Sequence, residues 1–295
     1  MKITNSAAAL LLSTALVAAG APGMSAEAAP AAAESVTAAA TIQVESYGPD
    51  ARNTLNIRPA PAGATTPAPI VITVPGGGWV REDNRSKRIT EVSDRLNELG
   101  YAVFSPNYRV ATAQRDGVPI MHQDIIRATR WVAANGARYG GDVSDINLLG
   151  GSSGAQLTTL AAELANVSTP GLVAGVIEMS GVMNWFDFRD LGLASTHEGA
   201  EAYLGCTLNN GGCTDAELTV PSPELRINPA SPKHLLINGA NEMLPPSQAE
   251  GMHESLRAAG IPSQLVLVTE GGGTQHGLAL FRYTEDDIVA FIDAD

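Results

Sequence analysis

Ser152 stands at the centre of a glycine-rich run, GGSSG at residues 150–154, which follows the apolar segment Ile146 to Leu149 and opens a stretch of helical period. A strand, a sharp turn and a helix in this order are typical of a nucleophile elbow, which presents a serine hydroxyl at the carboxyl end of a sheet. Glycine occurs two residues before and after Ser152, whereas Ser153 has it on one side only. The run therefore favours Ser152 as a nucleophile for acyl transfer, although a helix start that binds a phosphate or nothing has the same pattern.

A second glycine-rich run, PGGGW at residues 75–79, follows the apolar segment Pro69 to Val74. Consecutive glycines expose backbone N–H groups, and each donor aimed at the oxygen that becomes negative in a tetrahedral intermediate is worth about 3 kcal/mol. We expect Gly77 and Gly78 to donate together with the backbone N–H of Ser153. A plain surface turn is the alternative, and nucleotide binding is disfavoured because neither run has a G-x-x-x-x-G-K-[ST] or G-x-G-x-x-G pattern.

A serine hydroxyl needs a base that takes its proton and an acid that orients the base. His276 lies in the loop GGGTQHG after the late apolar segment Gln264 to Val268, at the sheet edge where Ser152 is expected. Glu242 is the only carboxylate in residues 238–245, the loop after the penultimate strand. The other histidines fall in helical stretches, in an insertion or at the start of a strand: His122, His253, His197 and His234.

Short apolar runs alternate with stretches of helical period, and this alternation predicts an α/β fold. The expected buried strands are Pro69–Val74, Tyr101–Ser105, Ile146–Leu149, Gly175–Met179, His234–Ile237 and Gln264–Val268. The expected helices are Ser86–Leu99, Met121–Tyr139, Ala155–Leu164, Ser247–Ala259 and Thr284–Ile292. Two alternating segments, Thr41–Tyr47 and Thr54–Arg58, predict an antiparallel start. The expected fold is a mostly parallel, doubly wound sheet, interrupted by a small cap insertion at about residues 184–228.

The amino-terminal residues have the composition of a secretory signal peptide. Met1 and Lys2 form a positive end, and the apolar stretch Ala7 to Ala19 is too short for a bilayer span. Small residues at positions 26 and 28 predict cleavage after residue 28. We expect residues 29–40 to be a flexible leader, with an ordered helix as the alternative, and residues 41–295 to form one domain. The protein is thus expected to be secreted or periplasmic, with no membrane span after cleavage.

Cysteine usage and net charge bear on cofactors and partners. In an oxidising compartment Cys206 and Cys213 are expected to form a disulfide, which in so short a loop contributes about 2 kcal/mol. Their spacing fits neither a metal site nor a redox CxxC motif, and we expect no metal and no cofactor. A net charge of −13 at pH 7 argues against nucleic acid as a partner. The sequence leaves the oligomeric state open.

From about residue 68 to residue 277 the chain resembles the bacterial α/β-hydrolase esterases of the hormone-sensitive-lipase-like and feruloyl/acetyl-esterase-like group. The matching pieces are PGGGW at 75–79, GYAVFSPNYR at 100–109, RWVAANGARYG at 130–140, GGSSGAQL at 150–157, NGANEMLPP at 238–246 and QHG at 275–277. The resemblance implies an α/β-hydrolase fold, and the order Ser152, Glu242, His276 is the order of nucleophile, acid and base in that fold. It also implies the oxyanion donors Gly77, Gly78 and Ser153.

Two departures from this group concern the site. Members of the group usually begin the glycine motif with histidine, and this chain has Pro75 there. The acid is more often aspartate, and Glu242 reaches one methylene further. For residues 107–109 and Asp124 the resemblance implies polar contacts of the scaffold and no catalytic role.

The expected function is that of a secreted serine hydrolase that cleaves short-acyl or aryl carboxylic esters through an acyl-enzyme. A small-molecule or polysaccharide-linked ester is the expected substrate. Trp79, Val80, Trp185 and Phe186 are candidates for lining the substrate pocket, and core packing is the alternative for each. A lactonase, amidase or peptidase could use the same triad, and a hydrolase-fold protein that binds a small ligand without turnover is the alternative of another class.

Overall fold

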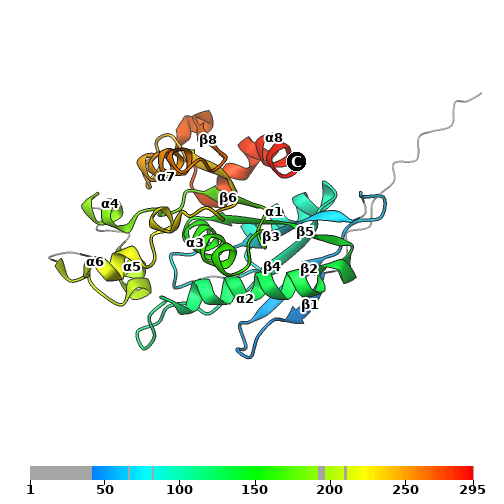
Figure 1. Cartoon of the computed structure of the whole chain (residues 1–295), viewed down its shortest axis with the longest axis horizontal. Coiled ribbons are helices and arrows are strands. Elements are labelled where there is room, and N and C mark those ends of the chain that lie inside the picture. Colours follow the sequence, from blue (N-terminus) through cyan, green and yellow to red (C-terminus); the bar gives the residue numbers. More distant parts are fainter. Residues whose placement is uncertain (1–41, 66, 82, 192–196, 209–210, 295) are drawn as a thin grey trace, which may run out of the picture. The chain divides into compact units, whose positions relative to one another are not determined.

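A computed structural model describes residues 42–294 except 66, 82, 192–196 and 209–210 (Figure 1). The predicted signal peptide, residues 1–28, and the predicted leader, residues 29–40, lie outside the described residues. Within the described part of the chain, every helix is too short or too polar to cross a membrane.

The centre of the fold is an eight-stranded sheet with the order β1-β2-β4-β3-β5-β6-β7-β8. Its strands are β1 (Gln43–Ser46), β2 (Thr54–Arg58), β3 (Ala68–Val74), β4 (Ala102–Pro106), β5 (Gly141–Gly151), β6 (Gly175–Met179), β7 (Lys233–Gly239) and β8 (Ser263–Val268). The first strand pairs antiparallel with β2, and β2 pairs antiparallel with β4. Every later pairing is parallel. The prediction of a mostly parallel sheet with an antiparallel start is therefore confirmed.

Helices cover both faces of the sheet, as the continuous apolar strands require. Alternate residues of β3 point to opposite faces. Ile70 and Ile72 pack with α2 (Ile120–Asn135) and α3 (Ser153–Ser168). Val71 packs on the opposite face with α1 (Lys87–Glu98) and α8 (Phe281–Ile292). The remaining long helix, α7 (Ser247–Ala258), packs on Leu236 of β7.

The boundaries of three helices differ from the expected ones by more than one residue. Helix α8 begins at Phe281, three residues before its expected start at Thr284. The segment expected as one helix over residues 121–139 is α2 followed by a 3-10 turn, η1 (Gly136–Tyr139), which ends at Gly140 in the left-handed conformation. Helix α3 begins at Ser153, two residues before the expected start, because the chain turns into the helix directly after Ser152.

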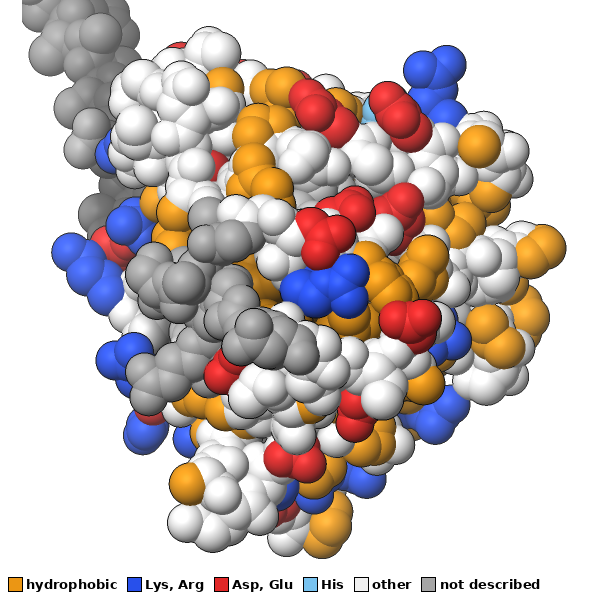
Figure 2. Space-filling model, turned by 90° about the vertical axis from the view of Figure 1, so that its left-hand side faces the viewer, with side chains coloured by type: hydrophobic (Ala, Val, Ile, Leu, Met, Phe, Trp, Pro, Cys, Tyr) orange, Lys and Arg blue, Asp and Glu red, His pale blue; other side chains and the backbone are white. Residues whose placement is uncertain are grey.

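Short helices fill the segment between β6 and β7, where the sequence predicts a cap insertion. They are α4 (Trp185–Asp190), α5 (His197–Leu204), α6 (Asp215–Thr219) and the 3-10 turn η4 (Pro223–Arg226). A disulfide joins Cys206 and Cys213 within this segment. The face over these helices carries acidic side chains with hydrophobic ones between them, and its basic side chains lie mainly toward the margins (Figure 2).

The short helices are attached to the rest of the fold by an aromatic cluster. The Tyr203 ring stacks on Trp79 and on Trp185, with ring centroids 5.5 and 5.6 Å apart. Trp79 belongs to the second glycine-rich run, so the cluster ties α4 and α5 to that loop. The indole N–H of Trp79 also donates to Gln156 Oε1 of α3 at 3.0 Å.

Candidate active site

Ser152 occupies a sharp turn between β5 and α3. Its φ and ψ are 57° and −127°, a left-handed conformation that a residue with a side chain rarely adopts. The flanking glycines are needed for space. A Cβ at Gly150 would lie 2.4 Å from the carbonyl oxygen of Gly154, and one at Gly154 would lie 2.5 Å from that of Val74. Ser153 is already the first residue of α3, so the turn presents Ser152 as the sequence predicts.

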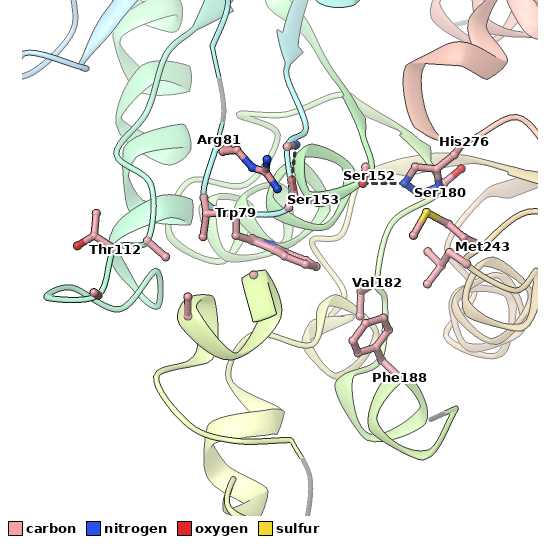
Figure 3. A pocket seen from close by; sticks show the side chains of 18 residues that line it. Trp79, Arg81, Thr112, Ser152, Ser153, Ser180, Val182, Phe188, Met243 and His276 are labelled. Carbon is pink, nitrogen blue, oxygen red and sulfur yellow. Dashed lines mark hydrogen bonds between the residues drawn. The ribbon is translucent and has the colours of Figure 1, made fainter. Parts of the chain in front are cut away.

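The structure brings Ser152, His276 and Glu242 together (Figure 3). His276 Nε2 lies 2.8 Å from Ser152 Oγ, and His276 Nδ1 makes a short hydrogen bond with Glu242 Oε2. The other carboxylate oxygen, Oε1, accepts from the Gly239 N–H at 3.0 Å and from the Ser180 hydroxyl at 2.5 Å. The glutamate side chain is fully buried and the histidine is 30% exposed. This arrangement can move a proton from the serine to the histidine.

Four neighbouring parallel strands, β5 to β8, place these groups at one edge of the sheet. Met179 at the end of β6 lies opposite Gly151 of β5 and Ile237 of β7. The ladder continues one residue further, because the Ser152 N–H donates to the Met179 carbonyl oxygen at 2.8 Å. The loops after β7 and β8 then bring Glu242 and His276 over this edge.

The second glycine-rich loop lies against the elbow. A Cβ at Gly76 would lie 2.3 Å from the carbonyl oxygen of Gly151. The hydroxyl of Tyr108 donates to the carbonyl oxygen of Pro75 at 2.6 Å and so holds the start of the loop. The predicted donor Gly77 gives its N–H to Ser153 Oγ at 3.0 Å. Gly78 follows with φ 64°.

Two of the polar residues expected in the scaffold, Arg109 and Asp124, form an ion pair in which the aspartate side chain is fully buried and the arginine side chain is 23% exposed. Arg109 Nη2 lies 2.6 Å from Asp124 Oδ1, and the backbone N–H of Arg109 donates to Asp124 Oδ2 at 3.1 Å. Burial acts to raise the pKa of Asp124, but hydrogen bonds from Arg109 and Asn53 together with the charge of Arg109 outweigh it and hold this pKa below its usual value. Neither Arg109 nor Asp124 is among the described residues that line the cavity next to Ser152.

A cavity of about 880 Å³ opens over Ser152. Val182, Phe188 and Met243 lie on one side of it, and Arg81 and Thr112 lie on the other (Figure 3). Two of the predicted pocket residues, Trp79 and Val80, line this cavity. Trp185 is completely buried in the aromatic cluster, and Phe186 packs at the edge of the core. Neither is among the described lining residues, and Phe188 of the same helix takes that place.

Sequence reasoning missed several residues of the site: Arg81, Thr112, Ser180, Val182, Phe188 and Met243. Arg81 is the only permanently charged side chain among the described residues that line the cavity. Ser180 carries the one signal that could have been used, because it directly follows the predicted strand Gly175–Met179. The others follow from loop conformations that the sequence pattern does not specify.

A second carboxyl group lies buried near Glu242. Burial raises the pKa of Glu178 to about 8, because the charged form loses its hydration. A hydrogen bond from the Gly181 N–H acts in the opposite direction, and the charge of Glu242 raises the pKa further. Glu178 therefore holds a proton at neutral pH, while Glu242 faces His276.

Comparisons with known proteins agree with this architecture. The BD-FAE family model matches residues 57–256. The esterase LipQ of Mycobacterium tuberculosis (strain ATCC 25618 / H37Rv) is 32% identical over 223 residues, which is 72% of this chain and 52% of LipQ. The chain thus spans about half the length of this curated relative.

Two solved structures have similar folds. Esterase B from Lactobacillus rhamnosis superposes with a TM-score of 0.68 at 21% identity and covers 85% of each chain. A truncated carbohydrate esterase from gut microbiota superposes with a TM-score of 0.71 at 20% identity and covers 87% of this chain and 96% of its own. The fold is the α/β-hydrolase fold.

Proposed function

Because the chain belongs to the BD-FAE family, we propose that it hydrolyses carboxylic esters through a covalent acyl-enzyme on Ser152. One observation carries the proposal: the hydrogen-bonded series from Ser152 Oγ to His276 and on to the buried carboxylate of Glu242. A hydroxyl becomes a competent nucleophile when a positioned imidazole takes its proton. The alternative that a glycine-rich loop binds a nucleotide phosphate is disfavoured, because neither glycine-rich run has the sequence pattern of such a loop.

In the proposed reaction, Ser152 Oγ attacks the ester carbonyl carbon while His276 Nε2 takes the hydroxyl proton. Glu242 keeps the other ring nitrogen protonated and stabilises the positive imidazolium. The tetrahedral intermediate collapses, the C–O bond of the ester breaks, and His276 gives its proton to the departing alcohol. A water then attacks the acyl-enzyme with His276 as base, which releases the acid and restores Ser152.

The oxyanion of both intermediates lies between the glycine loop and the start of α3. We assign its donors to the backbone N–H groups of Gly78 and Ser153, with Gly77 as the third. The Gly77 N–H donates to Ser153 Oγ, so we propose that it exchanges this acceptor for the oxyanion when an ester binds. Preorganised amides of this kind stabilise negative charge without rearranging solvent.

We propose short-acyl or aryl esters as the substrates, either free or linked to a polysaccharide. The support is the apolar side of the cavity, where Val182, Phe188 and Met243 can contact an acyl chain or an aromatic ring. The apolar signal-like stretch in residues 1–28 supports secretion or periplasmic location, as does the disulfide between Cys206 and Cys213.

The test is hydrolysis of 4-nitrophenyl acetate and butyrate by the wild type and by Ser152→Ala, with Ser144→Ala at an exposed serine as the control. We expect wild type and S144A to turn over both esters and S152A to lose at least about 1,000-fold in kcat. A fluorophosphonate should label Ser152, as read by peptide mass spectrometry. Equal activity in S152A would mean that another group is the nucleophile.

A substrate panel then separates the alternatives. Feruloyl esters, a lactone, an anilide and an aminoacyl substrate report the aryl esterase, lactonase, amidase and peptidase activities in turn. If the wild type turns over no member of the panel and takes no fluorophosphonate, the proposal of a hydrolase is wrong. A protein that binds a small ligand without turnover would then be the remaining function.

A further inference from the structure

We propose that Ser180 is a positioning residue that holds the acid and the base of the triad in their reactive arrangement. This inference rests on the proposed ester hydrolysis and adds a fourth polar side chain to its machinery. Ser180 acts through Glu242 and through the loop of His276, and its hydroxyl performs no proton transfer with the substrate.

The Ser180 hydroxyl connects the two loops that carry the acid and the base. It donates to Glu242 Oε1 at 2.5 Å and accepts from the backbone N–H of Gly277 at 3.0 Å. Gly277 is the residue after His276, so the Ser180 hydroxyl oxygen is hydrogen-bonded both to the acid and to the backbone next to the base. The Ser180 hydroxyl thus acts as a donor and as an acceptor at the same time.

The sheet gives Ser180 a place equivalent to that of the nucleophile. It directly follows β6, the strand between β5, which leads to Ser152, and β7, which leads to Glu242. Its backbone N–H donates to the carbonyl oxygen of Ile237 at 2.9 Å, so the end of β6 is fixed to β7. Four adjacent strand ends therefore supply nucleophile, positioning hydroxyl, acid and base in spatial order.

The backbone of Ser180 is held in an unfavourable conformation. In the described part of the chain, three non-glycine residues have positive φ: Trp79, Ser152 and Ser180, with values of 65°, 57° and 60°. All three line the cavity. Glycine would adopt this conformation without strain, so a serine that is 1% exposed points to a use of its side chain at the site.

Glutamate as the triad acid makes such a contact useful. Glu242 has one more rotatable bond than aspartate, and Oε2 alone faces His276. The hydrogen bonds of Ser180 and Gly239 to Oε1 fix the rotation of the carboxylate, so that Oε2 stays directed at Nδ1. Without the hydroxyl, the carboxylate can rotate and the imidazole loses its orientation.

The experiment is a double-mutant cycle on kcat and KM for 4-nitrophenyl acetate with Ser180→Ala, Glu242→Ala and the double variant. We expect S180A to lower kcat by roughly 10- to 100-fold with KM changed less than twofold, because the alignment of the triad is lost. In the E242A background, the same replacement should have no further effect, because there is no carboxylate left to position. A loss of equal size in both backgrounds would overturn the proposal.

Two further variants separate positioning from folding. Ser180→Gly removes the hydroxyl and relieves the backbone strain, so it should fold at least as well as wild type and still lose kcat as S180A does. Ser93→Ala removes a buried hydroxyl that bonds to Thr73 and Ser105 at 2.8 and 3.0 Å away from the cavity, and it should keep wild-type kcat. Wild-type kcat in S180G would show that the hydroxyl is not used.

The outcome also separates this inference from the proposed function. If wild type hydrolyses esters through Ser152 and S180A keeps its kcat, only the role of Ser180 fails. If wild type hydrolyses none of the esters, the proposed function fails and the role of Ser180 fails with it.

Discussion

Replacing Glu178 by glutamine should stabilise the protein at neutral and alkaline pH and leave its stability nearly unchanged near pH 4.5. Glu178 is a completely buried carboxyl group at the next-to-last position of β6, and its pKa is raised from 4.5 to about 8, mainly because burial removes the water that would solvate its charge. Glutamine has nearly the same shape and remains neutral at every pH, so it replaces the protonated acid.

The size of the effect follows from proton linkage. Between pH 4.5 and pH 8 the unfolded chain has released the Glu178 proton, while the folded chain still holds it. Since the folded state binds more protons, the free energy of unfolding falls as pH rises through this window. From pH 5 to pH 7.5 this group lowers the free energy of unfolding of wild type by about 3 kcal/mol, and glutamine removes that loss.

The assay compares thermal unfolding of wild type and Glu178→Gln at pH 5 and pH 7.5. The quantity of interest is the Tm of E178Q minus the Tm of wild type. For a chain of this size, a gain of about 3 kcal/mol should raise this difference by roughly 6 to 12 °C between pH 5 and pH 7.5. Glu254→Gln, at an exposed glutamate of α7, is the control and should show the same difference at both pH values. A Tm difference for E178Q that does not change between pH 5 and pH 7.5 would refute the view that burial keeps this carboxyl group protonated.

Two other substitutions test the geometry of the site. Gly154→Ala should cost about 3 kcal/mol of stability and most of the activity, because its Cβ would lie 2.5 Å from the carbonyl oxygen of Val74, and Gly151 to Ser153 would have to move with it. Gly251 lies inside α7, and the nearest atom to a Cβ added there is Glu224 Oε2 at 3.7 Å. Gly251→Ala is therefore the control and should be neutral or stabilising in the thermal unfolding assay. We define the charge preference as the ratio of kcat/KM for the anionic ester 4-nitrophenyl hemisuccinate to kcat/KM for its neutral methyl ester. Arg81→Gln should lower this ratio about fivefold, because one exposed charge pair contributes about 1 kcal/mol. The exposed Arg85→Gln should leave that preference unchanged, and equal ratios in wild type and R81Q would contradict the assignment of Arg81 to the substrate cavity.

The sequence was sufficient to predict where the triad would lie because the sheet does most of the positioning. Apolar runs identified the strands, and parallel strands end at one edge, so a nucleophile motif after β5 and single candidates after β7 and β8 had to converge. Residue type was then enough to select His276 and Glu242, since they are the only histidine and the only carboxylate in their loops. The glycine loop was placed by the same reasoning, because it follows β3 beside β5.

Features that depend on the direction of one peptide or one side chain could not be predicted in this way. Gly77 was expected to donate to an oxyanion, and its N–H donates to Ser153 Oγ. Trp185 and Phe188 lie on one short helix, and the sequence pattern does not say which of the two rings meets the cavity. The structure buries the first against Tyr203 and lets the second line the cavity.

Ser180 combines a position that the sequence predicts with contacts that it does not predict. Its position at the end of β6 was predictable, since it follows from the strand Gly175 to Met179 and from the order of the sheet. Its role depends on a left-handed backbone and on a rotamer that reaches Glu242 and Gly277, and the sequence MSGVM at residues 179–183 carries no sign of either. A strand order can therefore place a polar side chain at an active edge, but the contacts that make it a positioning residue have to be read from the folded chain.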